Sequence, residues 1–188
     1  RFRVRLPSAD RMRYLEAVSY TFPMALLVGR LACTLAHDHP GTVTNFPLAV
    51  SLASAPARAY IAQVYLGAGR LSELPPPATL ASMGFHDLGW YEFLYLGFVV
   101  VPITLWLARV QRRTGTFVAS FLVLYMPVRF LFDFLRVGDT RYAGLTPAQW
   151  VSLIMLSALP VVFFLARRSP RQAGAQADGS ETSEGRSI

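Results

Sequence analysis

Four long apolar stretches, nearly free of charge, constrain this chain more than any other feature. They cover residues 14–36, 88–109, 116–135 and 149–166. A helix of about 20 apolar residues is long enough to cross the hydrocarbon core of a bilayer. The composition agrees, because 53% of the 188 residues are hydrophobic and only 15% are charged, which is too apolar for a soluble domain. The sequence predicts an all-α membrane protein with about four transmembrane helices.

The spans are joined by one long loop, over residues 40–87, and by shorter connections. Residues 56–71 within that loop mix apolar and polar positions, so we expect either a short helix at the membrane surface or a packed loop. Pro102 and Pro160 predict kinks in the second and fourth spans. We predict one transmembrane domain over residues 1–168. The chain begins at Arg1 without a methionine, so four spans that form part of a larger helical bundle remain an alternative.

Charge placement predicts the orientation. The net charge of +7 comes from arginines gathered at the ends of the apolar stretches, at 1–13, 109–113 and 167–171. Positive residues favour the cytoplasmic side, so both chain ends are predicted inside and the long loop outside. We predict a disordered cytoplasmic tail over 169–188, because it lacks aromatic residues and cannot bury enough surface to fold. No basic face runs along the chain, which argues against a nucleic-acid partner.

Charged side chains inside the predicted spans point to function, since each is costly to insert in a membrane. Arg129, Asp133 and Arg136 follow one another at helical spacing and share one face. Arg30 and Glu92 lie at the same depth on the outer side. Two converging arginines suit a phosphate, because a guanidinium offers a fork of donors and stays charged. We predict a phospholipid head group as ligand; the alternative is a purely structural set of ion pairs, Arg129 with Asp133 and Arg30 with Glu92.

His37, Asp38 and His39 stand together at the outer end of the first span. Pro40 favours an extended backbone at His39, and extended residues two apart face the same way. The two histidines could therefore act together as a general base or, with His86, as metal ligands. A metal site would need further ligands that the sequence does not place, so we predict none. Ordinary polarity at a helix end is the remaining alternative.

Three motifs resemble those of the bacterial prolipoprotein diacylglyceryl transferases. Residues 29–33 (GRLAC), with Asp38 and Gly41, resemble the family signature G-R-x-G-N followed by N-G-E-x-x-G. Tyr91 and Glu92 resemble the end of its Q-L-Y-E motif. The most specific match is to its closing pattern Y-x-x-x-R-F-x-x-E-x-x-R-x-x-D and L-T-x-x-Q, carried here by Tyr125, Arg129, Phe130, Asp133, Arg136, Asp139, Leu145, Thr146 and Gln149.

The chain also departs from the family pattern. Ala32 and Cys33 replace the glycine and asparagine of the signature, His37 replaces a glycine, and Gly89 replaces the glutamine before Tyr-Glu. Asp38 and Asp133 are one methylene shorter than the glutamates that they match. The family's upstream His-Gly-Gly motif does not occur in these 188 residues.

The resemblance implies a transferase of lipoprotein biosynthesis in the bacterial cytoplasmic (inner) membrane, a multi-pass protein with its active face outward. It would move the diacylglyceryl group of phosphatidylglycerol to the lipobox cysteine of a prolipoprotein signal peptide, without a cofactor. Under this interpretation Arg30, Arg129 and Arg136 bind the substrate phosphate, and Glu92 and Asp133 orient them. His37, His39 and Asp38 are the catalytic candidates. The alternatives are a divergent or inactive relative that handles another lipid, and a structural membrane protein or small transporter.

Overall fold

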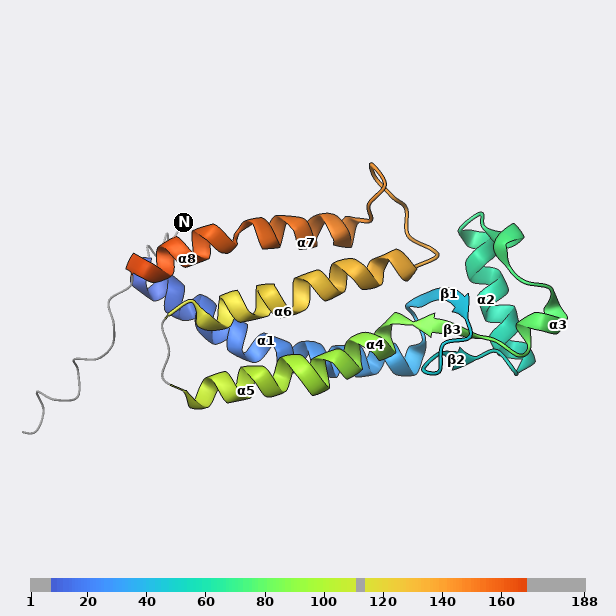
Figure 1. The fold of residues 1–188 in the computed structure, drawn as a ribbon, viewed down its shortest axis with the longest axis horizontal. Coiled ribbons are helices and arrows are strands. Elements are labelled where there is room, and N and C mark those ends of the chain that lie inside the picture. The colour runs from blue at the N-terminus through green and yellow to red at the C-terminus, as the bar shows by residue number, and fades with distance from the viewer. Residues whose placement is uncertain (1–7, 111–113, 169–188) are drawn as a thin grey trace, which may run out of the picture.

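The protein is a bundle of long apolar helices with a small lobe at one end (Figure 1). The computed structural model describes residues 8–110 and 114–168. Within them, four helical spans are long and apolar enough to cross a membrane: Arg13–Ala36, Leu88–Arg109, Thr116–Leu135 and Pro147–Leu165. These agree closely with the four predicted stretches, and the predicted fold class, a membrane protein of transmembrane helices, is confirmed.

The spans differ in how regular they are. The first is one helix, α1 (Ser8–Ala36), which continues through Pro23. The second consists of α4 (Leu88–Tyr95), a π-helical turn η2 (Leu96–Val100) and α5 (Val101–Arg109). The third is α6 (Thr116–Phe132), closed by a 3₁₀ turn η3 (Asp133–Leu135), and the fourth is α7 (Pro147–Ser157) followed by α8 (Leu159–Arg168).

Both predicted kink positions coincide with irregular backbone. The π-helical turn ends at Val100, two residues before Pro102, whose missing N–H cannot continue the ladder of the preceding turn. The fourth span divides at Ala158, two residues before Pro160. The helix start at α7 is well capped, since Thr146 and Gln149 form a capping box.

The long loop folds into a lobe with a three-stranded antiparallel sheet, which the sequence did not predict. The sheet has the order β1-β3-β2, from β1 (Pro40–Thr44), β2 (Val50–Ser51) and β3 (Gly84–Asp87). Two helices, α2 (Ala55–Gly67) and α3 (Pro77–Leu80), and a 3₁₀ turn η1 (Leu71–Glu73) complete it. The short helix expected in this region forms as α2, and its buried Ile61 and Tyr65 belong to a core with Phe85 of the sheet.

Close packing inside the lobe makes Gly84 a test of the sheet. A Cβ atom at this position would lie 2.7 Å from the Val50 carbonyl oxygen and 2.8 Å from the Ala49 Cβ. We expect Gly84→Ala to destabilise the protein by about 1–3 kcal/mol, the usual cost of overpacking. Thermal unfolding in detergent measures the loss. Gly67→Ala is the control, because no atom lies within 4 Å of its added Cβ; an equal loss in both variants would contradict the packing.

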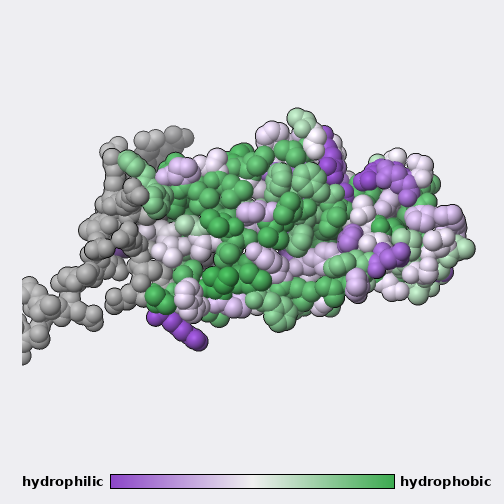
Figure 2. Space-filling view, in the orientation of Figure 1, coloured by the Kyte–Doolittle hydropathy of each residue, from purple (hydrophilic) through white to green (hydrophobic). Residues whose placement is uncertain are grey.

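The ends of the bundle differ in polarity. Figure 2 shows hydrophobic residues over the helical part, while hydrophilic residues gather over the lobe. The chain's first described residues, the end of α5, the start of α6 and the end of α8 lie at the end opposite the lobe (Figure 1). The predicted tail and most of the arginines used for the orientation, within 1–12, 111–113 and 166–171, lie outside the residues whose side chains are described.

Candidate functional site

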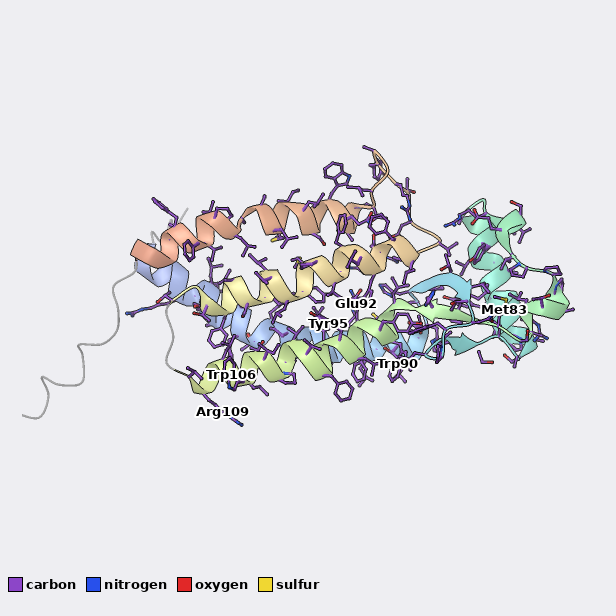
Figure 3. The ribbon with its side chains drawn as sticks, in the orientation of Figure 1. Met83, Trp90, Glu92, Tyr95, Trp106 and Arg109 are labelled. Carbon is purple, nitrogen blue, oxygen red and sulfur yellow. The ribbon has the colours of Figure 1, made fainter. Side chains whose placement is uncertain are left out.

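Glu92 joins three spans at the centre of the site. Its carboxylate is 1% exposed and lies on α4 between the helices (Figure 3). One oxygen, Oε1, accepts a 2.6 Å hydrogen bond from Arg129 Nη1 of α6. The other, Oε2, accepts a 2.7 Å bond from the Tyr125 hydroxyl and lies 2.7 Å from Arg30 Nε of α1. Glu92 lies near the start of α4, and Arg30 and Arg129 lie near the ends of α1 and α6.

The ion pairs differ from those that the sequence suggested. Arg30 does pair with Glu92, as expected, but Arg129 contacts Glu92 more closely than Asp133, whose Oδ1 is 3.4 Å from Arg129 Nη2. Arg30 Nε is buried and is not aligned for a hydrogen bond with the carboxylate, so this contact is an ion pair only. Each arginine side chain is 12% exposed. Two guanidinium groups thus share the buried carboxylate of Glu92, and Arg129 also faces the carboxylate of Asp133.

A second carboxylate, Asp133, ties the end of α6 to α7. It is fully buried and accepts a hydrogen bond from the Thr146 hydroxyl at the start of α7. Its Oδ1 faces Arg129 and Arg136, at 3.4 and 3.9 Å, without a hydrogen bond. Gln149 of the same capping box donates to the Phe130 carbonyl oxygen over 3.2 Å. The α6–α7 corner is therefore fixed by polar contacts next to the arginines.

Arg136 lies at the mouth of the site, where α6 meets the lobe. Its Nη1 is 2.9 Å from Asp139 Oδ2, and its backbone bridges to Gly41 of β1. A side chain at Gly41 would lie 2.9 Å from the Leu135 carbonyl oxygen and 2.8 Å from Leu88 Cδ1. Glycine at this position thus lets the sheet approach both α4 and the end of α6.

His37 and His39 have separate partners in this structure, Asp87 for His37 and Arg30 and Asp38 for His39. His37 Nδ1 lies 2.6 Å from Asp87 Oδ2, and Asp87 is fully buried at the start of α4. The His37 backbone has a φ of 51°, a left-handed conformation that costs a non-glycine residue about 1–2 kcal/mol. Its carbonyl oxygen accepts a 2.5 Å bond from the Tyr60 hydroxyl, and its side chain is 45% exposed.

His39 is engaged at both ring nitrogens. Arg30 Nη1 lies 3.3 Å from Nε2, and Nδ1 is hydrogen bonded to Asp38. Burial alone would raise the pKa of Asp38, but the hydrogen bond and charge of His39 outweigh it and lower that pKa. Cys33, one turn after Arg30, lies 4.0 Å from Arg30 Nη1. The Arg30 side chain is thus surrounded by Glu92, His39 and Cys33.

His86 lies apart from the other two histidines. Its Nδ1 is 2.8 Å from the Tyr91 hydroxyl, and burial lowers its pKa. Both residues line an apolar pocket of about 370 Å³ with Phe46, Leu48, Leu94, Phe132 and Leu135. This histidine is therefore not part of the group around Arg30.

The sequence did not indicate the roles of three residues of this site, Asp87, Thr146 and Tyr125. Asp87, which orients His37, could have been suspected as a helix cap, since it precedes Leu88 and accepts from the Trp90 amide. Thr146 and Tyr125 belonged to the quoted closing pattern, without an expected role. Their hydroxyl groups prove to be the buried donors to Asp133 and Glu92.

The residues that form this site belong to a chain that matches a known family almost throughout. The model of the prolipoprotein diacylglyceryl transferase family matches residues 2–165. The chain belongs to this family. The family motifs quoted from the sequence contribute Arg30, Glu92, Arg129 and Asp133, which the structure brings together at the lobe end of the bundle.

Individual relatives show how much of the family protein this chain represents. A phosphatidylglycerol–prolipoprotein diacylglyceryl transferase of Chromohalobacter salexigens is 28% identical over 146 residues, which cover 78% of this chain and 45% of the relative. The enzyme of that name from Bordetella avium is 34% identical over 113 residues, covering 55% and 43%. That of Teredinibacter turnerae is 23% identical over 171 residues, covering 87% and 51%. The chain thus spans about half the length of the relatives that it matches.

Proposed function

We propose that this protein transfers the diacylglyceryl group of phosphatidylglycerol to the thiol of a lipobox cysteine in a prolipoprotein. The observation that carries the proposal is the pair of arginines, Arg30 and Arg129, which come from two different spans and both contact the buried carboxylate of Glu92. Family membership and the names of the relatives supply the reaction class. The geometry supplies a reason why this end of the bundle would hold a phosphodiester.

The arginines would act on the leaving group. The acceptor sulfur attacks the glyceryl carbon bonded to phosphate, so that an S–C bond forms as the C–O bond breaks. The electron pair of that bond leaves with glycerol phosphate, whose new negative charge Arg30 and Arg129 stabilise. Glu92 and Asp133 hold the two guanidinium groups in position. Arg136, at the mouth, balances the charge of the head group.

Of the two histidines, we assign the proton transfer to His37. The carboxylate of Asp87 accepts a hydrogen bond from Nδ1 of His37. The imidazole proton therefore lies on Nδ1, and Nε2 is left to accept the proton of the thiol. His39 is less suited, because both of its ring nitrogens are occupied by Arg30 and Asp38. We propose that His39 and Asp38 position Arg30 instead.

We propose a location in the bacterial inner membrane with the lobe on the outer side. The positive-inside rule supports this orientation, since Arg109 lies at the end of the bundle away from the lobe (Figure 3). The transmembrane domain over 1–168 and the cytoplasmic tail over 169–188 belong to the same proposal.

The direct test is transfer by the purified protein in lipid nanodiscs. Phosphatidylglycerol labelled in the glyceryl carbons of its diacylglyceryl group is supplied with a lipobox peptide, and a peptide with serine in place of cysteine serves as the control. We expect label on the cysteine peptide alone, in a linkage that hydroxylamine does not cleave. If folded protein labels neither peptide, the proposed reaction fails, and binding of another lipid by a divergent relative becomes the better interpretation.

His37→Gly separates catalysis from stability. Glycine relieves the left-handed backbone strain of about 1–2 kcal/mol, which offsets the lost contact with Asp87, worth about 1.5–3 kcal/mol. We therefore expect the free energy of unfolding to change little, while the rate of diacylglyceryl transfer falls by about 10²–10⁴-fold, the usual contribution of a general base. Both are measured on the same preparation.

The matched control is Ala143→Gly. Ala143 also has a φ of 51°, but it lies in the exposed connection between α6 and α7. This variant should gain stability and keep its transfer rate. A normal rate in His37→Gly would contradict the assignment of His37.

A further inference from the structure

Cys33, Asp38 and His39 bring three different donor atoms to one place. The Cys33 sulfur, a carboxylate oxygen of Asp38 and a ring nitrogen of His39 all lie within 4.8 Å of one another. They come from the last turn of α1 and the three residues that follow it. Thiolate, imidazole and carboxylate are the ligands that zinc takes in proteins, and catalytic zinc sites use three protein ligands with the fourth position open.

One of these ligands, Cys33, and its neighbour Gly89 depart from the family motif quoted above. Cys33 stands where the signature quoted above has asparagine, and Gly89 stands where it has glutamine. The two positions are in contact, since a Cβ at Gly89 would lie 3.2 Å from the Cys33 Cβ. The missing side chain at Gly89 therefore gives the cysteine its room.

Arg30 occupies the space between the donors. Its Nη1 is 3.3 Å from His39 Nε2 and 4.0 Å from the Cys33 sulfur. A guanidinium group and a metal ion cannot both use these donors, because both are cations. The same Arg30 side chain has an alternative partner in Glu92, 2.7 Å from its Nε.

We propose that Cys33, Asp38 and His39 bind a thiophilic divalent cation of the zinc class, in exchange for the Arg30 contact. Zinc–ligand bonds of about 2.0–2.3 Å require donors closer together than 4.8 Å, so the three side chains close in as Arg30 turns to Glu92. Asp38 is half exposed, which gives the ion a route from the outer side. The site does not depend on the proposed transfer reaction.

Cobalt titration tests the site, because a thiolate bound to Co²⁺ gives an intense near-ultraviolet charge-transfer band. The tag-free full chain is titrated with Co²⁺ in detergent, and Zn²⁺ is then added to displace it. We expect a band that appears at one equivalent, disappears with zinc and is unaffected by Mg²⁺. Absence of the band at millimolar Co²⁺ would overturn the proposal.

Variants should change the affinity in opposite directions. Cys33→Ser removes the band, and the affinity falls by more than the roughly 10–100-fold that loss of an outer partner causes. Arg30→Met removes a competing unit charge about 4 Å from the donors and should tighten binding roughly tenfold or more. This gain in affinity keeps the test decisive even if Cys33→Ser fails to fold.

The control is His86→Ala, which removes a histidine that pairs with Tyr91 outside the cluster. It should bind cobalt as the wild type does. A band that persists in Cys33→Ser, or an affinity that is unchanged or weaker in Arg30→Met, would contradict the site.

Discussion

Arg129→Ala is expected to lower diacylglyceryl transfer by about 10²–10³-fold, the effect of removing one donor from a site that stabilises developing charge. The side chain is mostly buried and contacts both Glu92 and Asp133, so water cannot replace it as a donor to phosphate. The kcat should fall more than the KM rises, because the leaving group carries most charge in the transition state.

Two variants sharpen this result. Arg129→Lys keeps the charge but loses the forked donor, and we expect an intermediate rate. Arg109→Ala removes an exposed arginine at the other end of the second span, and its rate should equal that of the wild type. Equal rates in Arg129→Ala and the wild type would remove Arg129 from the phosphate site.

Glu92→Gln should cause the largest loss of stability. Its carboxylate is the only anion between Arg30 and Arg129 among the contacts described above, and it also accepts from Tyr125. Removing one partner of a buried ion pair costs about 3–5 kcal/mol, and here two arginines would be left facing each other. Thermal unfolding in detergent, read from the loss of helical circular dichroism, measures the effect.

Glu73→Gln is the matched control for this variant. Glu73 accepts two bonds of 2.6 and 2.7 Å from Arg70, as close as those at Glu92, but it lies on the surface of the lobe. Exposed pairs contribute little, because water competes for both charges. We expect no measurable change in unfolding, so similar losses in both variants would show that burial does not decide the energetics.

The sequence predicted the helices and the charged residues of the site, because both signals are local. Apolar length indicates a span, and a charge within it is conspicuous wherever it lies. The ion-pair partner of Arg129 was harder to predict, because the spacing of Arg129 and Asp133 on one helix suggested a local pair. Contact between α4 and α6 instead brings Glu92 closer to Arg129, and such a contact has no trace in the spacing of residues.

The lobe and the histidine partners could not be predicted for a related reason. The strands are short, β2 having two residues, so alternation of polar and apolar positions has no room to develop. Asp87 follows His37 by fifty positions and reaches it only because β1 pairs with β3. His37 in a left-handed conformation is likewise visible only in the backbone, although the family's glycine at that position was a hint.

The way in which β3 continues into α4 limits how a lipid can reach the arginines. Asp87 is both the last residue of β3 and the cap of α4, while Gly41 of β1 bridges to Arg136 after α6. Raising the lobe like a lid would break the strand–helix junction and this bridge together. We therefore expect the lobe to keep its position relative to the helices. A phospholipid would then enter the site laterally between the spans, without leaving the bilayer.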